Sequence, residues 1–122
     1  MLRLWKAFWY SLAGLRDAWR EPAPRLEVVL LAIAVPITLW LPVGVVEKLL
    51  LFGSVVAIFV VELLNTSVEA AIDRIGPERH ELSRIAKDIG SAAVFVASVF
   101  AAIVWAALAG PVLWNWWFVR AA

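Results

Sequence analysis

Three long apolar stretches fill most of this 122-residue chain, and they limit its possible folds more than any other feature. Each is close to the ~20 residues that a helix needs to cross the hydrocarbon layer of a bilayer. Hydrophobic residues make up 64% of the sequence and the mean hydropathy is +0.88, whereas a soluble domain is only ~45–50% apolar. The sequence therefore predicts an all-α membrane protein, with a single domain over residues 1–122 and three transmembrane helices.

The first 21 residues predict a helix of a different kind. Charged residues interrupt this segment throughout, so we expect it to be retained and not cleaved as a signal peptide. At 100° per residue, tryptophan and other apolar side chains fall on one side of the helix and charged side chains on the other. The charged side comprises Arg3, Lys6, Asp17 and Arg20. Such a helix suits the headgroup layer, and we expect Pro22 and Pro24 to end it.

The predicted transmembrane helices cover residues 26–41, 45–74 and 82–108. Pro36 lies inside the first of them, where a proline is tolerated better than in a soluble helix, and it predicts a kink. The second is longer than the ~30 Å hydrocarbon layer at ~1.5 Å per residue, so its C-terminal end should project into water or headgroups.

Beyond residue 108, Gly110 and Pro111 predict the end of the third helix. The tail that follows contains Trp114, Trp116 and Trp117. Tryptophan is enriched at membrane interfaces, so this tail predicts a second aromatic anchor.

Arginine and lysine are concentrated in the N-terminal segment and around the loop between the second and third membrane helices, whereas the first loop has only Lys48. The positive-inside tendency then predicts that the N-terminus and second loop are cytoplasmic. The net charge of +1 is too small to attract nucleic acid through a general basic field. The chain has no cysteine, which excludes disulfides and thiol metal ligands.

A polar stripe on the second membrane helix is the most informative pattern. It consists of Glu62, Asn65, Glu69 and Asp73, all on one face. Carboxylates at membrane depth are costly and usually face a bundle interior or a water-filled cavity. Asn65 alone would fit a helix-packing role, but acidic side chains on one face repel unless they share a proton or a cation. Mg²⁺ would relieve this repulsion, because it prefers hard oxygen ligands.

Lys87 and Asp88 open the third membrane helix, and small residues that permit close helix approach follow them. These two residues either mark the membrane boundary or add a phosphate-binding cation and a further carboxylate to the stripe. His80, in the preceding loop, is either solvated or touches substrate. The glycines form neither a P-loop nor a protein-kinase glycine motif, so any nucleotide site must use side chains on helices.

Residues 62–76 (ELLNTSVEAAIDRIG), 80–83 (HELS) and 86–94 (AKDIGSAAV) resemble the signature of the prokaryotic diacylglycerol kinases, and Gly14, Leu15, Arg16 and Trp19 add to the resemblance. The resemblance implies a phosphotransferase of the bacterial inner membrane that converts diacylglycerol to phosphatidic acid with ATP and Mg²⁺. It also implies a homotrimer with active sites at subunit boundaries.

By position, the resemblance makes Glu62 the catalytic base and Glu21 and Glu69 the Mg²⁺ ligands. It assigns ATP contacts to Arg3, Tyr10, Glu21, Glu69, Glu78, His80, Lys87 and Asp88. It assigns lipid-substrate contacts or active-site packing to Arg3, Arg16, Trp19, Asn65 and Ser91. The chain is one residue shorter than family members between Trp19 and Arg25, which leaves Glu27 as the alternative to Glu21.

Two rival functions remain open from the sequence. The family also includes undecaprenol kinases, although residues 90–94 are more similar to the diacylglycerol-specific branch. An oligomeric channel or scaffold could use the acidic stripe as a pore lining, but that function does not account for Lys87 and Asp88 at the cytoplasmic mouth.

Overall fold

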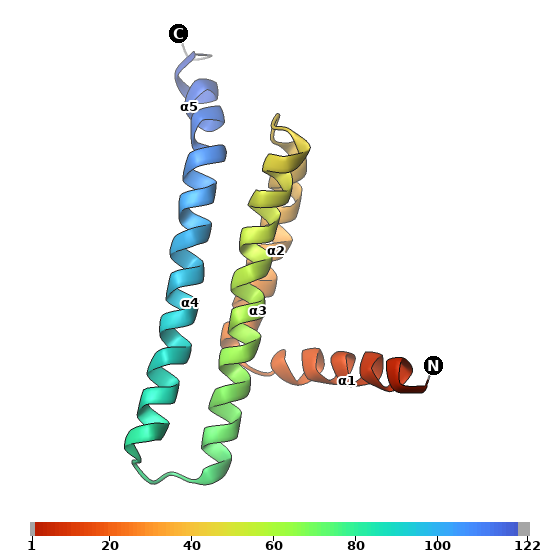
Figure 1. Cartoon of the computed structure of the whole chain (residues 1–122). Coiled ribbons are helices and arrows are strands. Elements are labelled where there is room, and N and C mark those ends of the chain that lie inside the picture. The colour runs from red at the N-terminus through yellow and green to blue at the C-terminus, as the bar shows by residue number, and fades with distance from the viewer. Residues whose placement is uncertain (1, 120–122) are drawn as a thin grey trace.

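The computed structural model describes residues 2–119, and over this range the chain is helical with no strand (Figure 1). The helices are α1 (Leu2–Ala18), α2 (Pro22–Trp40), α3 (Val45–Ile75), α4 (Glu81–Leu108) and α5 (Gly110–Val119). Of these, α2, α3 and α4 are the three that are long and apolar enough to cross a membrane. The predicted all-α fold with three transmembrane helices is confirmed.

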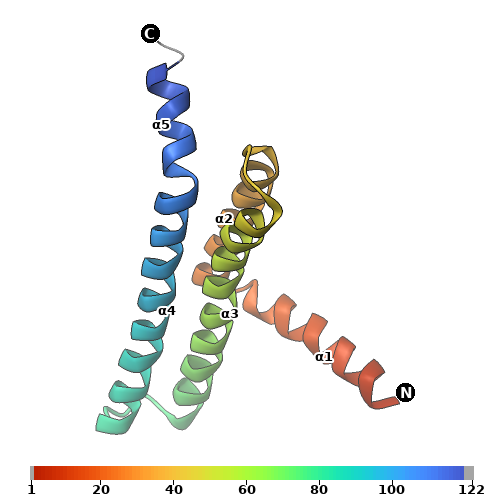
Figure 2. The ribbon, with the colours of Figure 1, turned by 45° about the horizontal axis from the view of Figure 1, so that its top comes forward.

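Helix α3 lies at the centre of the arrangement, because it packs against both α2 and α4. The three long helices run side by side, while α1 leaves the bundle at a steep angle and α5 continues beyond α4 (Figures 1 and 2). The α3–α4 loop lies at the end opposite α5. This geometry places the C-terminal end of α3 and the N-terminal end of α4 together.

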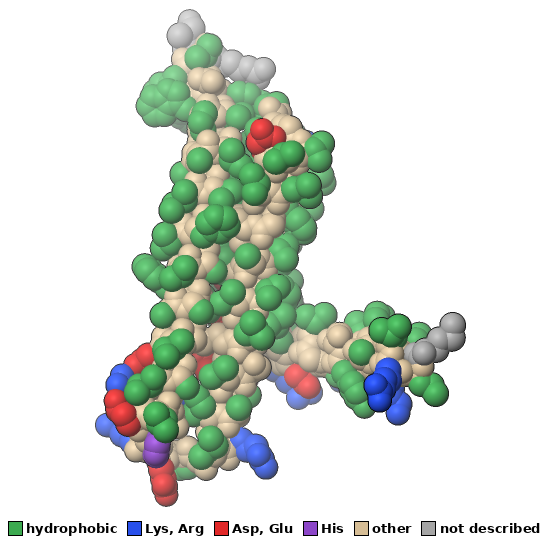
Figure 3. Space-filling view, in the orientation of Figure 1, with side chains coloured by type: hydrophobic (Ala, Val, Ile, Leu, Met, Phe, Trp, Pro, Cys, Tyr) green, Lys and Arg blue, Asp and Glu red, His purple; other side chains and the backbone are tan. Residues whose placement is uncertain are grey.

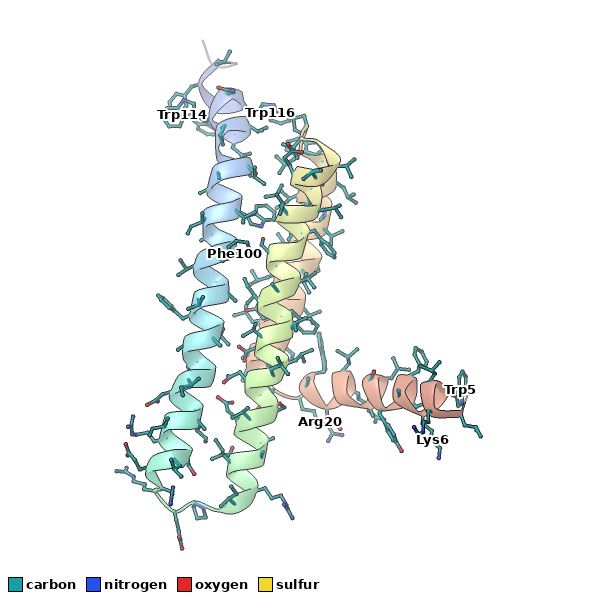
Figure 4. All side chains as sticks on the ribbon, viewed as in Figure 1. Trp5, Lys6, Arg20, Phe100, Trp114 and Trp116 are labelled. Atoms are coloured by element: carbon teal, nitrogen blue, oxygen red, sulfur yellow. The ribbon has the colours of Figure 1, made fainter. Side chains whose placement is uncertain are left out.

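The distribution of apolar and charged side chains on the surface suits a protein that contacts both lipid and water. Large apolar side chains such as Phe95 and Ile103 are exposed along the long helices, as expected where lipid replaces water. Charged side chains gather on α1 and around the α3–α4 loop (Figure 3). Trp5 and Lys6 project from opposite sides of α1 (Figure 4), which confirms the predicted amphipathic pattern.

Helix α2 begins at Pro22, earlier than the predicted start at residue 26, and α1 ends at Ala18. The prolines therefore open α2 as well as separating it from α1. The first turn of a helix needs no backbone N–H from its own residues, and the fixed φ of proline already suits it. Glu21 precedes Pro22 in an extended conformation as the N-cap residue.

The Trp-rich tail is also helical, so Gly110 and Pro111 interrupt the helical structure without ending it. Trp116 of α5 meets Trp40 of α2 edge to face, with ring centroids 4.4 Å apart. A small core of Leu41, Leu51 and Ala109 lies at the same end. Trp114 points away from the bundle (Figure 4). Its role as a membrane anchor stays a prediction.

Candidate functional site

The buried polar residues of the bundle include two acids, one from α2 and one from α3, and one amide from α3. Glu27 of α2 is 9% exposed, and Glu62 and Asn65 of α3 are 5% and 8% exposed. Buried carboxyl groups are costly in a protein interior, and within a membrane protein they usually mark a functional position.

Asn65 lies along α3 between the buried Glu62 and the more exposed part of the stripe. Its side-chain amide donates a hydrogen bond to Oε1 of Glu69 at 3.3 Å. Its own Oδ1 is buried and has no donor within residues 2–119. Gly90 of α4 faces this oxygen, and a Cβ added to Gly90 would overlap it. Gly90 thus allows α4 to approach Asn65, as the run of small residues predicted.

Lys87 joins α4 to the stripe on α3. Its ammonium group donates a hydrogen bond to Oδ1 of Asp73 at 2.7 Å. The negative charge of Glu69 also attracts this ammonium group. The prediction that Lys87 lies beside the acidic residues is confirmed. Asp88, by contrast, pairs with Arg84 on the exposed side of α4, so the structure does not bring Asp88 into contact with the stripe.

The α3–α4 loop forms a cleft of about 480 Å³ beside Lys87. It brings together three positions that the sequence assigned to nucleotide: Glu78, His80 and Lys87. The cleft also contains basic side chains that sequence reasoning did not single out, namely Arg79 and Arg84. Several cations around one cleft suit a phosphorylated ligand.

His80 has a structural role that the sequence did not reveal. It is the N-cap residue of α4, and its Nδ1 accepts a hydrogen bond from the backbone N–H of Leu82 at 3.1 Å. Histidine is not among the usual capping residues, so only the backbone geometry identifies the cap. The other ring nitrogen, Nε2, is the atom through which His80 would reach a ligand in the cleft.

A second groove, of about 710 Å³, separates α1 from α3. Glu21 lines it beside Thr66 and Ser67, and much of the remaining wall is apolar. Trp19 lines an adjoining pocket with Pro24 and Phe59. A groove of this kind suits a ligand that is mainly apolar with a few polar groups.

The remaining predicted site residues do not meet within one chain. Arg3, Tyr10 and Arg16 are exposed on α1, which runs away from the α3–α4 loop (Figure 1). Ser91 is exposed on α4. These positions reach a common site only if another surface completes it.

The predicted Mg²⁺ ligands also lie apart, since Glu21 faces the α1–α3 groove while Glu69 bonds to Asn65. Among the described residues, no three acidic or histidine side chains gather closely enough to hold a metal alone. Mg²⁺ usually takes only one or two carboxylates and fills its remaining positions with water and phosphate oxygens. Glu69, with Asp73 one turn further along α3, supplies hard oxygen donors of this type, so the residues fit the ion.

Comparison with known proteins supports the resemblance found in the sequence. The family model described as prokaryotic diacylglycerol kinase matches residues 9–109. The diacylglycerol kinase of Escherichia coli (strain K12) is 48% identical over 114 residues, which covers 93% of this chain and 90% of the relative. Those of Haemophilus influenzae and Pseudomonas aeruginosa are 48% and 41% identical, covering 79% and 87% of this chain and 82% and 87% of their own lengths. The family match includes the whole polar stripe and ends at Ala109, just before α5.

Proposed function

The chain belongs to the prokaryotic diacylglycerol kinase family, and we propose that it transfers the γ-phosphoryl group of ATP to the free hydroxyl of 1,2-diacylglycerol. The products are phosphatidic acid and ADP. The observation that carries the proposal is the line of polar side chains on otherwise apolar helices, from Glu62 in the bundle to the Asp73–Lys87 ion pair beside the loop cleft. This line of polar side chains extends from the level of a lipid headgroup in the membrane to the aqueous side, where the nucleotide is dissolved.

The nucleotide binds in the cleft of the α3–α4 loop. Phosphoryl transfer depends mainly on positioning and on stabilising the charge of the transferred group. Lys87 supplies a cation for the phosphates, and Arg79 lines the same cleft. Glu78 and His80 lie where they can contact the remainder of the nucleotide. The ion pair with Asp73 holds the Lys87 ammonium group at the inner wall before the nucleotide arrives.

Glu69 and Glu21 would hold Mg²⁺, which would supply positive charge to offset that of the transferred phosphoryl group. Glu27 is the weaker candidate for the second ligand, because its carboxyl is buried between α2 and α3. Glu21 and Glu69 face different grooves of one chain. A homotrimer with sites at subunit boundaries would supply the missing wall, and it would also give Arg3 and Tyr10 access to nucleotide.

Glu62 is the general base. Its carboxylate takes the proton of the lipid hydroxyl as that oxygen forms a bond to the γ-phosphorus. The bond from the γ-phosphorus to the bridging oxygen breaks, and ADP leaves with the electron pair. A positioned base typically contributes ~10²–10⁴-fold to the rate. Arg16 and Trp19 on α1 hold the headgroup region of the lipid, while Asn65 and Ser91 pack around the site.

The orientation follows from the charges. Lysine and arginine gather on α1 and around the α3–α4 loop (Figure 3), and this distribution supports a cytoplasmic location for both in a bacterial inner membrane. This is also the side on which ATP is available.

The test is a radiolabelled ATP assay of the purified protein in mixed micelles with diacylglycerol, with undecaprenol, or with neither lipid. We expect Mg²⁺-dependent labelling of phosphatidic acid. A higher kcat/KM with undecaprenol would assign the chain to the polyprenol branch instead. ATP consumption that is independent of lipid, or no consumption at all, would refute the proposed kinase reaction.

A further inference from the structure

The arginine and lysine side chains that line the cleft of the α3–α4 loop are Arg79, Arg84 and Lys87. Arg84 is bound on two sides along its own helix. Its Nη2 and Nε donate to the two carboxylate oxygens of Glu81 at 2.6 and 3.2 Å, and its Nη1 donates to Oδ2 of Asp88 at 2.5 Å. An anion that enters the cleft must therefore compete with both carboxylates for Arg84.

Arg79 differs from the other two cations. The Lys87 ammonium donates to Asp73 at 2.7 Å, whereas Arg79 forms no ion pair or side-chain hydrogen bond with any residue in the range 2–119. Two acids of the cleft, Asp73 and Glu81, are already paired, and the third, Glu78, is bound to none of the three cations. The Arg79 guanidinium is thus the positive charge of this cleft that no carboxylate compensates.

The backbone is constrained on both sides of Arg79. Gly76 ends α3 with a φ of +139°, which glycine adopts readily, and the φ of Pro77 is fixed by its ring. Directly after Arg79, His80 begins α4 as its N-cap, where its Nδ1 accepts a hydrogen bond from the backbone N–H of Leu82 at 3.1 Å. A loop held in this way loses less conformational entropy when Arg79 binds a ligand.

The position of Arg79 relative to Lys87 indicates which part of the ligand it meets. Lys87 lies six residues into α4 from Glu81, about 9 Å along the helix at ~1.5 Å per residue. Arg79 precedes the helix, so its backbone lies farther from the membrane than that of Lys87. A guanidinium also matches the planar arrangement of two phosphate oxygens, whereas an ammonium group acts as a point charge.

We propose that Arg79 binds the phosphates of the nucleotide that are not transferred. In this arrangement Lys87 meets the γ-phosphate, which is nearer the lipid, and Arg79 meets the α- and β-phosphates, so Arg79 holds ATP before the reaction and ADP after it. This inference rests on the proposed nucleotide site in the cleft.

Equilibrium binding of radiolabelled ATP and ADP, each with Mg²⁺, to the full chain in detergent tests this role without lipid turnover. Arg79→Ala should raise the Kd of both nucleotides about 10-fold or more, as expected for a lost hydrogen bond to a charged group. Arg79→Lys keeps a cation and should bind with intermediate affinity. Arg74→Ala is the matched control, because Arg74 is an exposed arginine in the last turn of α3 that does not line the cleft. It should bind both nucleotides as the wild type does.

The kinase assay gives a second readout. Arg79→Ala should raise the KM for ATP more than it lowers kcat, because a contact to phosphates that are not transferred is made equally in the ground state and the transition state. Thermal unfolding of each variant separates a loss of fold from a loss of binding. Arg79 is exposed and unpaired with protein groups, so its unfolding temperature should not change.

Three binding results would overturn the inference. One is an unchanged Kd in Arg79→Ala or no gain in affinity from Arg79→Ala to Arg79→Lys. Another is equal weakening by Arg74→Ala, which would assign the effect to the general positive field of the loop. A third is weaker binding of ATP with unchanged binding of ADP, which would place Arg79 at the γ-phosphate.

A lipid headgroup is another source of phosphate for Arg79, and phosphatidylglycerol added to the micelles distinguishes it from nucleotide. If this lipid raises the unfolding temperature of the wild type but not of Arg79→Ala, while the Kd for nucleotide is the same in both, Arg79 serves the membrane surface and the inference is wrong. Failure of the proposed kinase reaction is recognised separately, because the wild type would then bind nucleotide through Arg79 without forming phosphatidic acid.

Discussion

Gly90→Ala provides a quantitative test of the α3–α4 contact. The added Cβ would overlap Oδ1 of Asn65 and lie 3.3 Å from its Cγ, so the Asn65 side chain or α4 itself must move. Overpacking of this kind costs ~1–3 kcal/mol. If Asn65 moves, its hydrogen bond to Glu69 is also lost, at ~0.5–1.5 kcal/mol. The higher helix propensity of alanine offsets up to ~1 kcal/mol of this destabilisation. We therefore expect a net destabilisation of about 0.5–3.5 kcal/mol from these contributions.

The assay is thermal or denaturant unfolding in detergent, with kcat measured on the same preparations. Gly53→Ala is the matched control, since Gly53 also lies within a membrane helix but has no neighbour within 4 Å of an added Cβ; it should be neutral or slightly stabilising. Asn65→Ala should abolish most of the cost of Gly90→Ala, giving a coupling energy of ~0.5–3 kcal/mol in a double-mutant cycle. Two results would refute the close contact between Gly90 and Asn65: a stability of Gly90→Ala equal to that of Gly53→Ala, or no coupling energy between positions 90 and 65.

Three further substitutions test the more exposed part of the site. Glu69→Gln keeps an acceptor for the Asn65 amide but removes the charge, so Mg²⁺-dependent kcat should fall while the unfolding temperature is unchanged; full activity at saturating Mg²⁺ would contradict a ligand role. Lys87→Ala breaks an exposed ion pair worth only ~0–1 kcal/mol, so stability should barely change while the KM for ATP rises or kcat falls; wild-type values of both would leave Lys87 as a boundary residue. His80→Ala removes the N-cap of α4 and should cost ~0.5–2 kcal/mol, whereas His80→Asn should restore the cap; if unfolding of the two variants is identical, the cap does not stabilise α4.

The fold was predictable where hydropathy determines it. Each membrane helix has enough apolar residues to span a bilayer on its own, so no tertiary information was needed to find α2, α3 and α4. The prolines were predictable only in part. Helices α1 and α4 end at Ala18 and Leu108, shortly before Pro22 and Pro111 as predicted, but each proline also lies in the first turn of the next helix, a position that the sequence did not predict. Proline is compatible with either position, and sequence alone does not decide between them.

The site was predictable in part for a similar reason. The stripe on α3 follows from helical periodicity, and its proximity to Lys87 follows from a shared depth in the membrane. Asp88 shares that depth, but it lies four residues after Arg84 and pairs with it along the same helix. The burial of Glu27 depends on how α2 is rotated in the bundle, and the weakly amphipathic, proline-containing α2 gives no clear indication of that rotation in its sequence.

The length of α3 accounts for the way one helix serves two environments. At ~1.5 Å per residue, its 31 residues extend about 46 Å, well beyond a hydrocarbon layer of ~30 Å. Glu62 and Asp73 are separated by about 16 Å along the axis at that rise, and the first is buried while the second is exposed. In the proposed reaction, the hydroxyl of diacylglycerol would lie near the depth of Glu62, because its acyl chains hold it in the membrane, and the nucleotide would enter from the water near Lys87. Asn65 and Glu69 occupy the interval, so we expect them to control how the γ-phosphoryl group reaches the hydroxyl, and substitutions there should impair kcat more than the binding of either substrate.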